Sequence, residues 1–469
     1  MNNYYDYIVV GAGMAGLSFA HEMQKKGFKI LILEKDSSVG GLSKTLTYKE
    51  FKFDYCAHRF HSDNKKVMET VKKIMKENFY LHKQKSRILM FNKYLKYPFE
   101  LQNFLRAAPI HKAIVAGISF LVSMIKRIFI KRKIFHNYED WFTYFFGYNL
   151  YKLMSKDYTS KIWKTDPKYI SADWATQRFK QIKLKELVKK VVKKILKFDF
   201  SSYSLEDESL APDGGPFWYP QNGIQDIPNE YLKLILKSDS NVLLNSKLIN
   251  IDLDKKKIFF KMKNEEVLKS EKYTKGIVST IPLQSLYNAL NIKDKFIETH
   301  LKETYYMDMI FVYLILDKDQ ISNDHWLYFP DKKIIFNRAV EFKNWSKKMA
   351  PKNKTALCLD ISCYRLRSNN DNPWKKTNQE LIQKCVEDCI KANLINKEDF
   401  REGLVVRVKD AYPFYDINYK KKTRSIIDFF EKNREIFCIG RTGSFSYNNS
   451  DGSIEMGINL AEKLTKQIS

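Results

Sequence analysis

The sequence predicts an α/β fold. A Rossmann-like dinucleotide-binding domain is discontinuous along the chain and is accompanied by a helical domain and a second, mixed or antiparallel β-sheet domain. Three observations support this prediction. Residues 4–41 have the pattern of a strand, a glycine-rich turn, a helix and a second strand. Apolar runs at residues 275–281 and 436–439 resemble strands that return to the same sheet. Residues 303–365 alternate apolar and polar side chains, as the strands of a separate sheet do.

The N-terminal turn has the glycine spacing of a dinucleotide-binding motif. An apolar strand ends at Gly11, and Gly13 and Gly16 follow it. We expect Gly11 to allow the tight turn, Gly13 to let the backbone approach a pyrophosphate, and Gly16 to let the helix pack closely on the strand. Backbone N–H groups at the start of that helix, around Met14 and Ala15, would bind the anion. The alternative is a glycine turn in an ordinary α/β unit.

The second expected strand ends in an acidic residue. Glu34 lies close to the offset of about 20 residues at which such motifs carry a ribose-binding acid. Gly40 and Gly41 follow after a short interval, and this pair resembles the extended fingerprint of FAD enzymes in the amine oxidase superfamily. The resemblance favours FAD over NAD, which the spacing alone does not decide. Lys35, Gly41 and Leu42 join the expected cofactor contacts.

Composition restricts the partners. The chain has 469 residues, enough for two or three lobes, and a net charge of +27 that attracts anions such as nucleotides or anionic lipid. No nucleic-acid module is recognisable, so no nucleic-acid partner is expected. The six cysteines show no paired CxxC spacing, which predicts no metal site and a reducing cytoplasmic location. A strand begins so near the N-terminus that we expect no signal peptide.

Three domains are predicted, of which the first is assembled from separate pieces. Its C-terminal piece includes a strand at 436–439 and a final helix at 453–465, and its middle piece includes strands at 256–269 and 275–281. The expected boundaries are 1–70, 205–285 and 430–469 for the FAD-binding domain, 71–100 and 286–429 for the β-sheet substrate domain, and 101–204 for the helical substrate or lid domain.

Two apolar segments have basic neighbours and leave two interpretations open. Residues 113–125 are too short to span a membrane, which requires about 20 apolar residues. Residues 184–197 place leucine, isoleucine and valine on one helical stripe and lysine on the other face. Each segment is either a helix packed on the core or a helix in peripheral contact with an anionic membrane, at the inner face of a cytoplasmic membrane.

Three further blocks carry a family resemblance. They are FDYCAHRFHSDN with YLKYPF (53–64 and 94–99), YTSKIWKTDP (158–167) and GRTGSFSYNNSD (440–451). Together with the N-terminal fingerprint, in the same order, they resemble UDP-galactopyranose mutase and its flavoenzyme relatives. That family shows a GAHxFH-type block, a YTxKxW segment ending in a similar TDP, and a GRxGxxxY block near the C-terminus. The YTSKIWKTDP block is the most discriminating, because generic amine oxidases are not expected to carry it.

The resemblance implies an FAD-dependent nucleotide-sugar mutase in cell-surface polysaccharide biosynthesis. In that family the reduced flavin attacks the anomeric carbon, a flavin–sugar covalent adduct forms, and the pyranose contracts to a furanose without net redox change. The substrate would be a nucleotide-diphosphate sugar or a lipid-linked sugar, and an external reductant such as NAD(P)H would be needed. The alternative is an FAD-dependent oxidoreductase with net two-electron chemistry on an amine, a porphyrinogen or a lipid-linked sugar.

The same resemblance assigns the site residues. Arginine suits a diphosphate because its guanidinium group forms bidentate hydrogen bonds to phosphate oxygens. The expected catalytic residues are His58, His61, Arg338 and Arg441. The additional cofactor contacts are Gly440, Asp451 and Ser453, together with His58 and Arg441. The expected substrate contacts are Tyr158, Thr159, Trp163, Arg178, Arg338, Tyr412 and Tyr447.

Several structural alternatives and departures from the family pattern accompany these assignments. Trp163 could belong to the core, the histidines could be structural, and Asp451 could be the N-cap of the last helix or a flavin-region residue. Cys56 replaces the glycine expected before the alanine and histidine of the first block. Asn449 stands where the mutase block tends to carry an acid. The chain is also longer than the usual mutase, around residues 102–140 and 184–213, so the substrate could be a sugar other than UDP-galactose.

Overall fold

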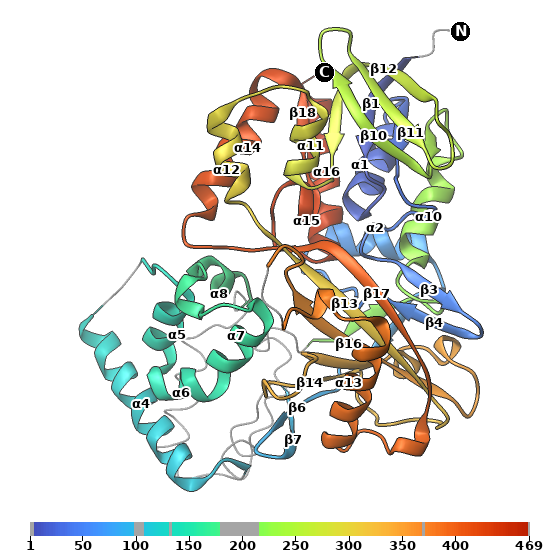
Figure 1. The fold of residues 1–469 in the computed structure, drawn as a ribbon. Coiled ribbons are helices and arrows are strands. Elements are labelled where there is room, and N and C mark those ends of the chain that lie inside the picture. The colour runs from blue at the N-terminus through green and yellow to red at the C-terminus, as the bar shows by residue number, and fades with distance from the viewer. Residues whose placement is uncertain (1–3, 98–106, 131–133, 179–214, 368–370, 468–469) are drawn as a thin grey trace.

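The computed structural model describes residues 4–97, 107–130, 134–178, 215–367 and 371–467. These residues form two large sheets and a group of helices (Figure 1). The sheet built on the N-terminal strand lies at the top of the view, the second sheet lies below it, and helices α4 to α8 lie beside the second sheet. The predicted fold class, a discontinuous Rossmann-like domain with a helical domain and a second sheet, is confirmed.

The first sheet has seven described strands, drawn from distant parts of the chain. Their order is β10-β11-β12-β1-β2-β9, with β18 also paired to β12, and β1 is parallel to both β2 and β12. The strands are β1 (Tyr4–Val10), β2 (Ile30–Leu33), β9 (Asn241–Leu243), β10 (Ser246–Asp252), β11 (Lys257–Met262), β12 (Leu268–Ser279) and β18 (Ile436–Cys438). The single strand expected at 256–269 is in fact an antiparallel pair, because a turn separates β11 from β12.

Helices cover this sheet, and two of them cross closely. The helices are α1 (Met14–Gln24), α2 (Lys65–Met75), α10 (Asp226–Ile235), α11 (Leu283–Ala289), α12 (Lys295–Lys302), α14 (Tyr419–Arg434), α15 (Gly440–Gly443) and α16 (Ser450–Lys466). A Cβ on Gly457 of α16 would lie 2.1 Å from Ser18 Oγ of α1. That Ser18 hydroxyl donates to the Ile454 carbonyl at 3.1 Å. The C-terminal helix therefore fixes the helix that follows the glycine turn.

The second sheet is mixed and mostly antiparallel. Its order is β17-β13-β16-β15-β14-β6-β7, and only the β14–β6 pair is parallel. The strands are β6 (Ser86–Met90), β7 (Lys93–Lys96), β13 (Tyr306–Leu316), β14 (Trp326–Tyr328), β15 (Arg338–Glu341), β16 (Thr355–Cys363) and β17 (Phe400–Pro413). Strand β16 is buried along its whole length, because α13 (Asn378–Lys391) covers the side of the sheet away from the first domain. Two two-stranded sheets, β3 (Thr45–Tyr48) with β4 (Phe51–Asp54) and β5 (Tyr80–His82) with β8 (Phe217–Tyr219), complete the strands.

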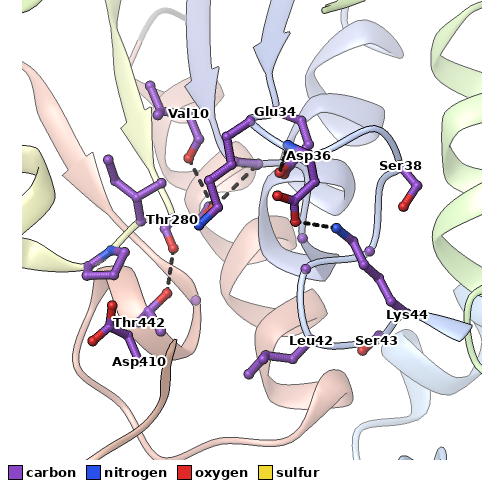
Figure 2. A pocket seen from close by; sticks show the side chains of 18 of the residues that line it. Val10, Glu34, Asp36, Ser38, Leu42, Ser43, Lys44, Thr280, Asp410 and Thr442 are labelled. Carbon is purple, nitrogen blue, oxygen red and sulfur yellow. Dashed lines mark hydrogen bonds and ion pairs between the residues drawn. The ribbon is translucent and has the colours of Figure 1, made fainter. Parts of the chain in front are cut away.

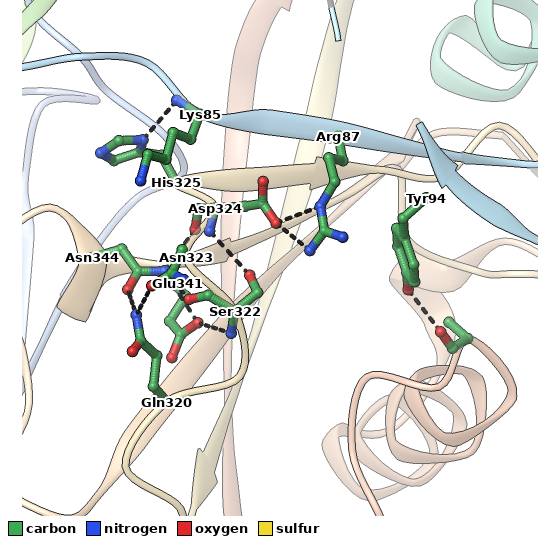
Figure 3. A network of polar contacts seen from close by, with 11 residues as sticks. Lys85, Arg87, Tyr94, Gln320, Ser322, Asn323, Asp324, His325, Glu341 and Asn344 are labelled. Atoms are coloured by element: carbon green, nitrogen blue, oxygen red, sulfur yellow. Dashed lines mark hydrogen bonds and ion pairs between the residues drawn. The ribbon is translucent and has the colours of Figure 1, made fainter. Parts of the chain in front are cut away.

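A polar network links β6 and the residue before it to the loop that precedes β14 in the same sheet (Figure 3). Arg87 of β6 donates from Nε to Asp324 at 2.7 Å. The Lys85 backbone N–H donates to Nδ1 of His325 at 3.0 Å, and the His325 N–H returns a bond to the Lys85 carbonyl. Glu341 accepts from the backbone N–H of Ser322 at 3.1 Å. Residues far apart in the sequence therefore share one sheet, although the predicted domain boundaries themselves stay a prediction.

The helical region does not bury its longest helix. It comprises α4 (Ile110–Phe129), α5 (Tyr138–Phe146), α6 (Tyr148–Tyr151), a π-helical turn (Lys152–Lys156), α7 (Asp157–Trp163) and α8 (Ala172–Arg178). Only Ala116 and Ser123 of α4 are buried, so the interpretation of residues 113–125 as a core-packed helix is wrong. The lysine-rich segment 184–197 lies outside the described residues. No helix in the described ranges combines the length and apolarity needed to cross a bilayer.

Candidate active site

The turn between β1 and α1 has the geometry that a bound pyrophosphate requires. Gly11 has φ +101°, a conformation that favours glycine, and a Cβ there would lie 2.2 Å from Thr280 Oγ1. A Cβ on Gly16 would lie 2.3 Å from the Gly11 carbonyl oxygen, so the helix packs directly on the turn. In contrast, a Cβ on Gly13 would meet no atom within 4 Å. The space beside Gly13 is therefore open, at the N-terminus of α1 where backbone N–H groups attract an anion.

Glu34 and the second glycine pair hold this turn from the other side. The buried Glu34 carboxylate accepts the Ala12 N–H at 2.8 Å and the Asp36 N–H at 3.0 Å. The Gly40 N–H donates to the Ala12 carbonyl at 2.8 Å, which brings Gly41 against Gly13. The acid and the glycine pair expected from the sequence thus meet at the turn.

A cavity of about 1140 Å³ extends from this turn toward the second sheet. Figure 2 shows Glu34 above it, Lys44 paired with Asp36, and Thr280 and Thr442 on the opposite wall. The volume exceeds that of most small-ligand pockets and suits an extended dinucleotide. The predicted cofactor residues that line it are Gly11, Gly13, Met14, Ala15, Glu34, Lys35, Gly41, Leu42, His58, Gly440, Arg441 and Ser453. Gly16 lies beneath the turn, and the roles of all these residues stay predictions.

The N-cap residue of α16 is not the one that the sequence suggested. Asn449, not Asp451, occupies the N-cap position, so the N-cap alternative for Asp451 is wrong. Asp451 lies within the first turn of the helix, where burial raises its pKa and the nearby His61 opposes that shift. Asp451 is not among the residues that line the cavity.

His58 lines the cavity as a neutral imidazole. Burial, followed by the positive charges of Arg441 and Arg338, lowers the pKa of His58 to about 3. Its Nδ1 atom is buried and has no hydrogen-bond partner among the described residues. A buried polar atom without a partner is costly, so this nitrogen is suited to a ligand group.

Arg441 is held rigidly next to His58. Its Nε donates to the Asn448 carbonyl at 2.8 Å, and Nη2 donates to the same oxygen. Its guanidinium carbon lies 4.6 Å from the ring centroid of Tyr412, which stacks on Tyr447 at 5.4 Å. Nη1 is buried and has no described partner. Because the acceptor of these bonds is a backbone carbonyl, it brings no negative charge to offset that of the guanidinium group at the cavity wall.

Arg338 forms a second cationic centre with two partners. Its Nε donates to Asp360 at 2.9 Å, and Nη2 contacts the Cys56 sulfur. Cys56 donates to the same Asp360 oxygen at 3.2 Å, and burial raises the Cys56 pKa to about 12, so the thiol is neutral. Cys56 has φ +79°, a conformation that favours glycine, the residue expected there from the family resemblance.

Two comparisons with known sequences match limited parts of the chain. Residues 9–74 match the family model of an NAD(P)-binding Rossmann-like domain. An 88-residue stretch is 35% identical to a UDP-galactopyranose mutase from Mycoplasma pneumoniae and covers 17% of this chain and 21% of that protein. A 49-residue stretch is 49% identical to an inactive all-trans-retinol 13,14-reductase from Danio rerio and covers 10% of this chain and 8% of the relative. The matches therefore span a small part of each relative.

Solved structures match over nearly the whole chain. A crystal structure of reduced UDP-galactopyranose mutase aligns with a TM-score of 0.81 and 21% identity, covering 99% of this chain and 96% of the other. The chain has the fold of UDP-galactopyranose mutase. A proposed protoporphyrinogen oxidase from Exiguobacterium sp. aligns with a TM-score of 0.73 at 13% identity, covering 99% of both chains. Putrescine oxidase bound to putrescine aligns with a TM-score of 0.60 at 12% identity, also covering 99% of both chains. The resemblance to UDP-galactopyranose mutase-like proteins that the motifs indicated is confirmed at the level of the fold.

Some predicted residues of this mutase-like fold do not point at the cavity. The Thr159 hydroxyl lies in a buried chain with Ser155, at 3.3 Å, inside the helical region. The ring nitrogens of His61 contact the Pro216 carbonyl and Asp63, and His61 does not line the cavity. Tyr158 packs edge-on against Tyr328, with ring centroids 5.9 Å apart. Arg178 ends α8, and its side chain lies outside the described part of the structure.

Trp163 connects the helical region to Tyr447, whose ring lies near Arg441. It is buried, its ring lies 6.0 Å from that of Tyr447, and its Nε1 has no partner among the described residues. Trp163 is therefore buried, as the core interpretation expects, and it also contacts Tyr447, a residue of the predicted site. Both can hold at once.

Sequence reasoning missed two residues that shape the site. Asp360 orients Arg338 from a fully buried strand, where its position alone gave no signal. Lys161 is buried in the YTSKIW block and donates to the carbonyls of Phe329 at 2.6 Å, Asp331 at 2.9 Å and Phe336 at 2.6 Å. This lysine anchors α7, and with it Trp163, to the loop between β14 and β15. In the sequence, Lys161 stands between Thr159 and Trp163, two residues that were predicted to face the substrate, and a lysine at that spacing could have indicated a buried role.

Proposed function

We propose that the protein is an FAD-dependent mutase that converts the pyranose ring of a nucleotide-diphosphate sugar to the furanose. One observation carries the proposal: Arg441 and His58 line a dinucleotide-sized cavity, and Arg338 lies near His58. Tyr412 and Tyr447 do not line the cavity, but their rings pack against Arg441. These residues come from separate parts of the sequence. Asp360 already pairs with Arg338, whereas Arg441 donates to a backbone carbonyl and keeps Nη1 without a partner among the described residues. A doubly charged diphosphate is the ligand that such an arrangement favours.

The described residues fit FAD. The open space beside Gly13 and the N-terminus of α1 suit the pyrophosphate, and Glu34 suits the ribose. The unpartnered His58 Nδ1 and Arg441 Nη1 provide polar groups for the part of the ligand that reaches the second sheet. When bound, the reduced flavin would supply the nucleophile for the anomeric carbon.

The chain's own residues would bind and orient the substrate and would neutralise the charge of its diphosphate. Arg441 keeps its geometry through Asn448 and Tyr412, so little side-chain entropy is lost when it binds a phosphate. The rings of Tyr412 and Tyr447 pack against Arg441, and burial raises the pKa of Tyr412, so its hydroxyl stays a hydrogen-bond donor. His58 remains neutral across the physiological range and can hydrogen-bond without adding charge.

The reaction balances without an oxidant. The bond between the anomeric carbon and the diphosphate oxygen breaks, the sugar ring opens and recloses on another hydroxyl, and the diphosphate bond forms again. The two arginines stabilise the diphosphate while it carries the extra negative charge of the leaving group. Only the resting redox state of the flavin requires a donor, for which we propose NAD(P)H. A furanose nucleotide would then serve cell-surface polysaccharide synthesis.

A conversion assay tests this proposal. The FAD-loaded protein is reduced under anaerobic conditions and incubated with a panel of nucleotide sugars, and the products are separated by chromatography. We expect a furanose product from one of them, with no net flavin oxidation, and its loss in Arg441→Ala. Arg401→Ala, which removes an exposed arginine paired with Asp317, is the matched control. Absence of any conversion by reduced protein that carries stoichiometric FAD would refute the mutase proposal.

The second candidate is an oxidase with net two-electron chemistry, which the shared fold with putrescine oxidase favours. Stoichiometric flavin reduction by an amine, a porphyrinogen or a lipid-linked sugar, with an oxidised product, would favour this candidate over the mutase.

A further inference from the structure

Helix α4 exposes its apolar residues and buries its small or polar ones. Large side chains at positions 110, 114, 118, 121, 125 and 128 recur at intervals of three and four residues, so they form one stripe. Along this stripe Ile110 is 77% exposed, Ile118 56% and Ile128 69%, and the adjacent Phe129 is 80% exposed. A helix of an isolated globular protein would turn such a stripe toward the core.

The other side of α4 explains why the helix cannot rotate. Position Gly147, at the start of α6, lies so close that a Cβ there would be 2.3 Å from the Ser119 carbonyl oxygen. Ser119 Oγ accepts the Asn149 N–H at 3.1 Å, and Ser123 is buried. Arg127 places its guanidinium carbon 5.7 Å from the ring centroid of Phe145. These contacts of small and polar residues hold the apolar stripe outward, along the outer edge of the molecule (Figure 1).

The charged residues of α4 itself have one sign. Helix α4 contains no aspartate or glutamate, and Lys112 and Lys126 are exposed on its flank. In the sequence, no acidic residue occurs from residue 101 to residue 138. An apolar helix face whose own helix carries lysine and arginine and no acid complements a surface that is apolar below and anionic above.

We propose that the exposed face of α4 binds the surface of an anionic membrane, with the helix lying in the plane of the interface. The 20 residues of α4 extend about 30 Å at 1.5 Å per residue, so the whole stripe can enter the headgroup boundary at once. A second copy of the chain, with its own net charge of +27, would repel this basic face, whereas anionic headgroups neutralise it. The proposal is independent of the reaction proposed above.

Vesicle co-sedimentation tests the proposal. The full-length protein is mixed with vesicles of phosphatidylcholine containing about 30% phosphatidylglycerol, or of phosphatidylcholine alone, at low and high salt. We expect binding to the anionic vesicles at low salt and at least about tenfold weaker binding to the neutral ones. Ile118→Glu with Ile125→Glu should lower the binding to anionic vesicles by at least about tenfold, because two apolar anchors become acidic.

A matched pair of substitutions separates this face from general surface effects. Val267→Glu with Phe296→Glu changes two exposed apolar residues elsewhere, and binding should be unchanged. Ile118→Trp gives a second readout that preserves folding: vesicles with brominated chains should quench its added fluorescence. Three results would overturn the proposal: no binding to anionic vesicles at low salt, equal loss in both acidic pairs, or a dimer that dissociates in the α4 variant while vesicles are ignored.

Discussion

Replacing Gly13 with alanine should separate dinucleotide binding from folding. The Gly13 backbone, at φ −78° and ψ 178°, is equally accessible to alanine, and the new methyl group would meet no protein atom within 4 Å. Alanine is a poorer N-cap than glycine by up to about 1 kcal/mol. The smaller entropy of the unfolded chain offsets about 0.4–1 kcal/mol of this. The free energy of unfolding of the ligand-free protein should therefore change by less than about 1 kcal/mol.

Gly16 provides the contrasting case. A Cβ there would lie 2.3 Å from the Gly11 carbonyl oxygen and 2.9 Å from a methyl carbon of Val9, well inside the roughly 3.5 Å at which such atoms attract. Because the closest atom belongs to the backbone, the strain costs about 1–3 kcal/mol or more. Helix propensity returns at most about 1 kcal/mol. Gly16→Ala should therefore destabilise the ligand-free protein by about 2 kcal/mol, whereas Gly13→Ala should not.

Gly13→Ala, which should leave stability nearly unchanged, should weaken FAD binding. The methyl group of Gly13→Ala enters the space that a pyrophosphate would occupy, so we expect FAD affinity to fall at least tenfold, or about 1.4 kcal/mol. Flavin fluorescence quenching measures the affinity, and thermal unfolding of the flavin-free proteins measures stability. If Gly13→Ala bound FAD as tightly as the wild type, the assignment of this space to the pyrophosphate would be refuted.

Three further outcomes are expected. Arg441→Ala should weaken binding of UDP to the reduced, FAD-loaded protein by about 10- to 150-fold in calorimetry, since hydrogen bonds to charged groups contribute about 1.5–3 kcal/mol. Cys56→Gly should be more stable to urea than Cys56→Ala by about 1 kcal/mol, because both lose the sulfur contacts but only glycine adopts φ +79° without strain. Stability should fall from pH 7 to pH 5, because burial lowers the pKa of His21 and of His325 to about 4, while in the unfolded chain each binds a proton below about pH 6.5. Each buried histidine contributes about 1–2 kcal/mol to that fall.

Matched variants control these outcomes. Arg401→Ala should leave UDP affinity unchanged, and an equal loss there would assign the effect to overall charge. Equal stability of the two Cys56 variants would mean that the positive φ carries no strain. His325→Asn keeps an acceptor for the Lys85 N–H and should reduce the pH dependence, whereas exchange of the exposed His111 for glutamine should not. An unchanged pH profile in His325→Asn would contradict the assignment.

The N-terminal motif was predictable because its chemistry is local. The glycines, the acid and the two apolar runs lie within one stretch of chain, and each has a conformational reason that the sequence displays. The structure adds the contacts: Glu34 accepts the Ala12 N–H, and Gly40 donates to the Ala12 carbonyl. The resemblance of distant blocks also indicated that Arg338, Arg441 and Tyr447 belong together, although no local rule brings them near one another.

Other features required the packed chain. The alternation at residues 303–365 predicted a sheet, yet β16 is buried on both faces because α13 covers one side. Asp360 was invisible as a site residue, since its role depends on the register that places Arg338 opposite it. The apolar run of α4 was compatible both with a helix buried in the core and with a helix on a membrane. Hydrophobicity indicates that a segment prefers an apolar environment, but it does not distinguish a protein core from a lipid surface.

The sequence by itself determined the strand–turn–helix–strand unit, the order of the motifs and the excess of positive charge, because these depend on near neighbours and composition. Only the tertiary structure decided that Arg441 stacks on Tyr412, that Cys56 joins Arg338 and Asp360, and that α4 turns its apolar stripe outward. Contacts between residues hundreds of positions apart depend on how the sheets and helices pack, and that packing is a property of the whole chain.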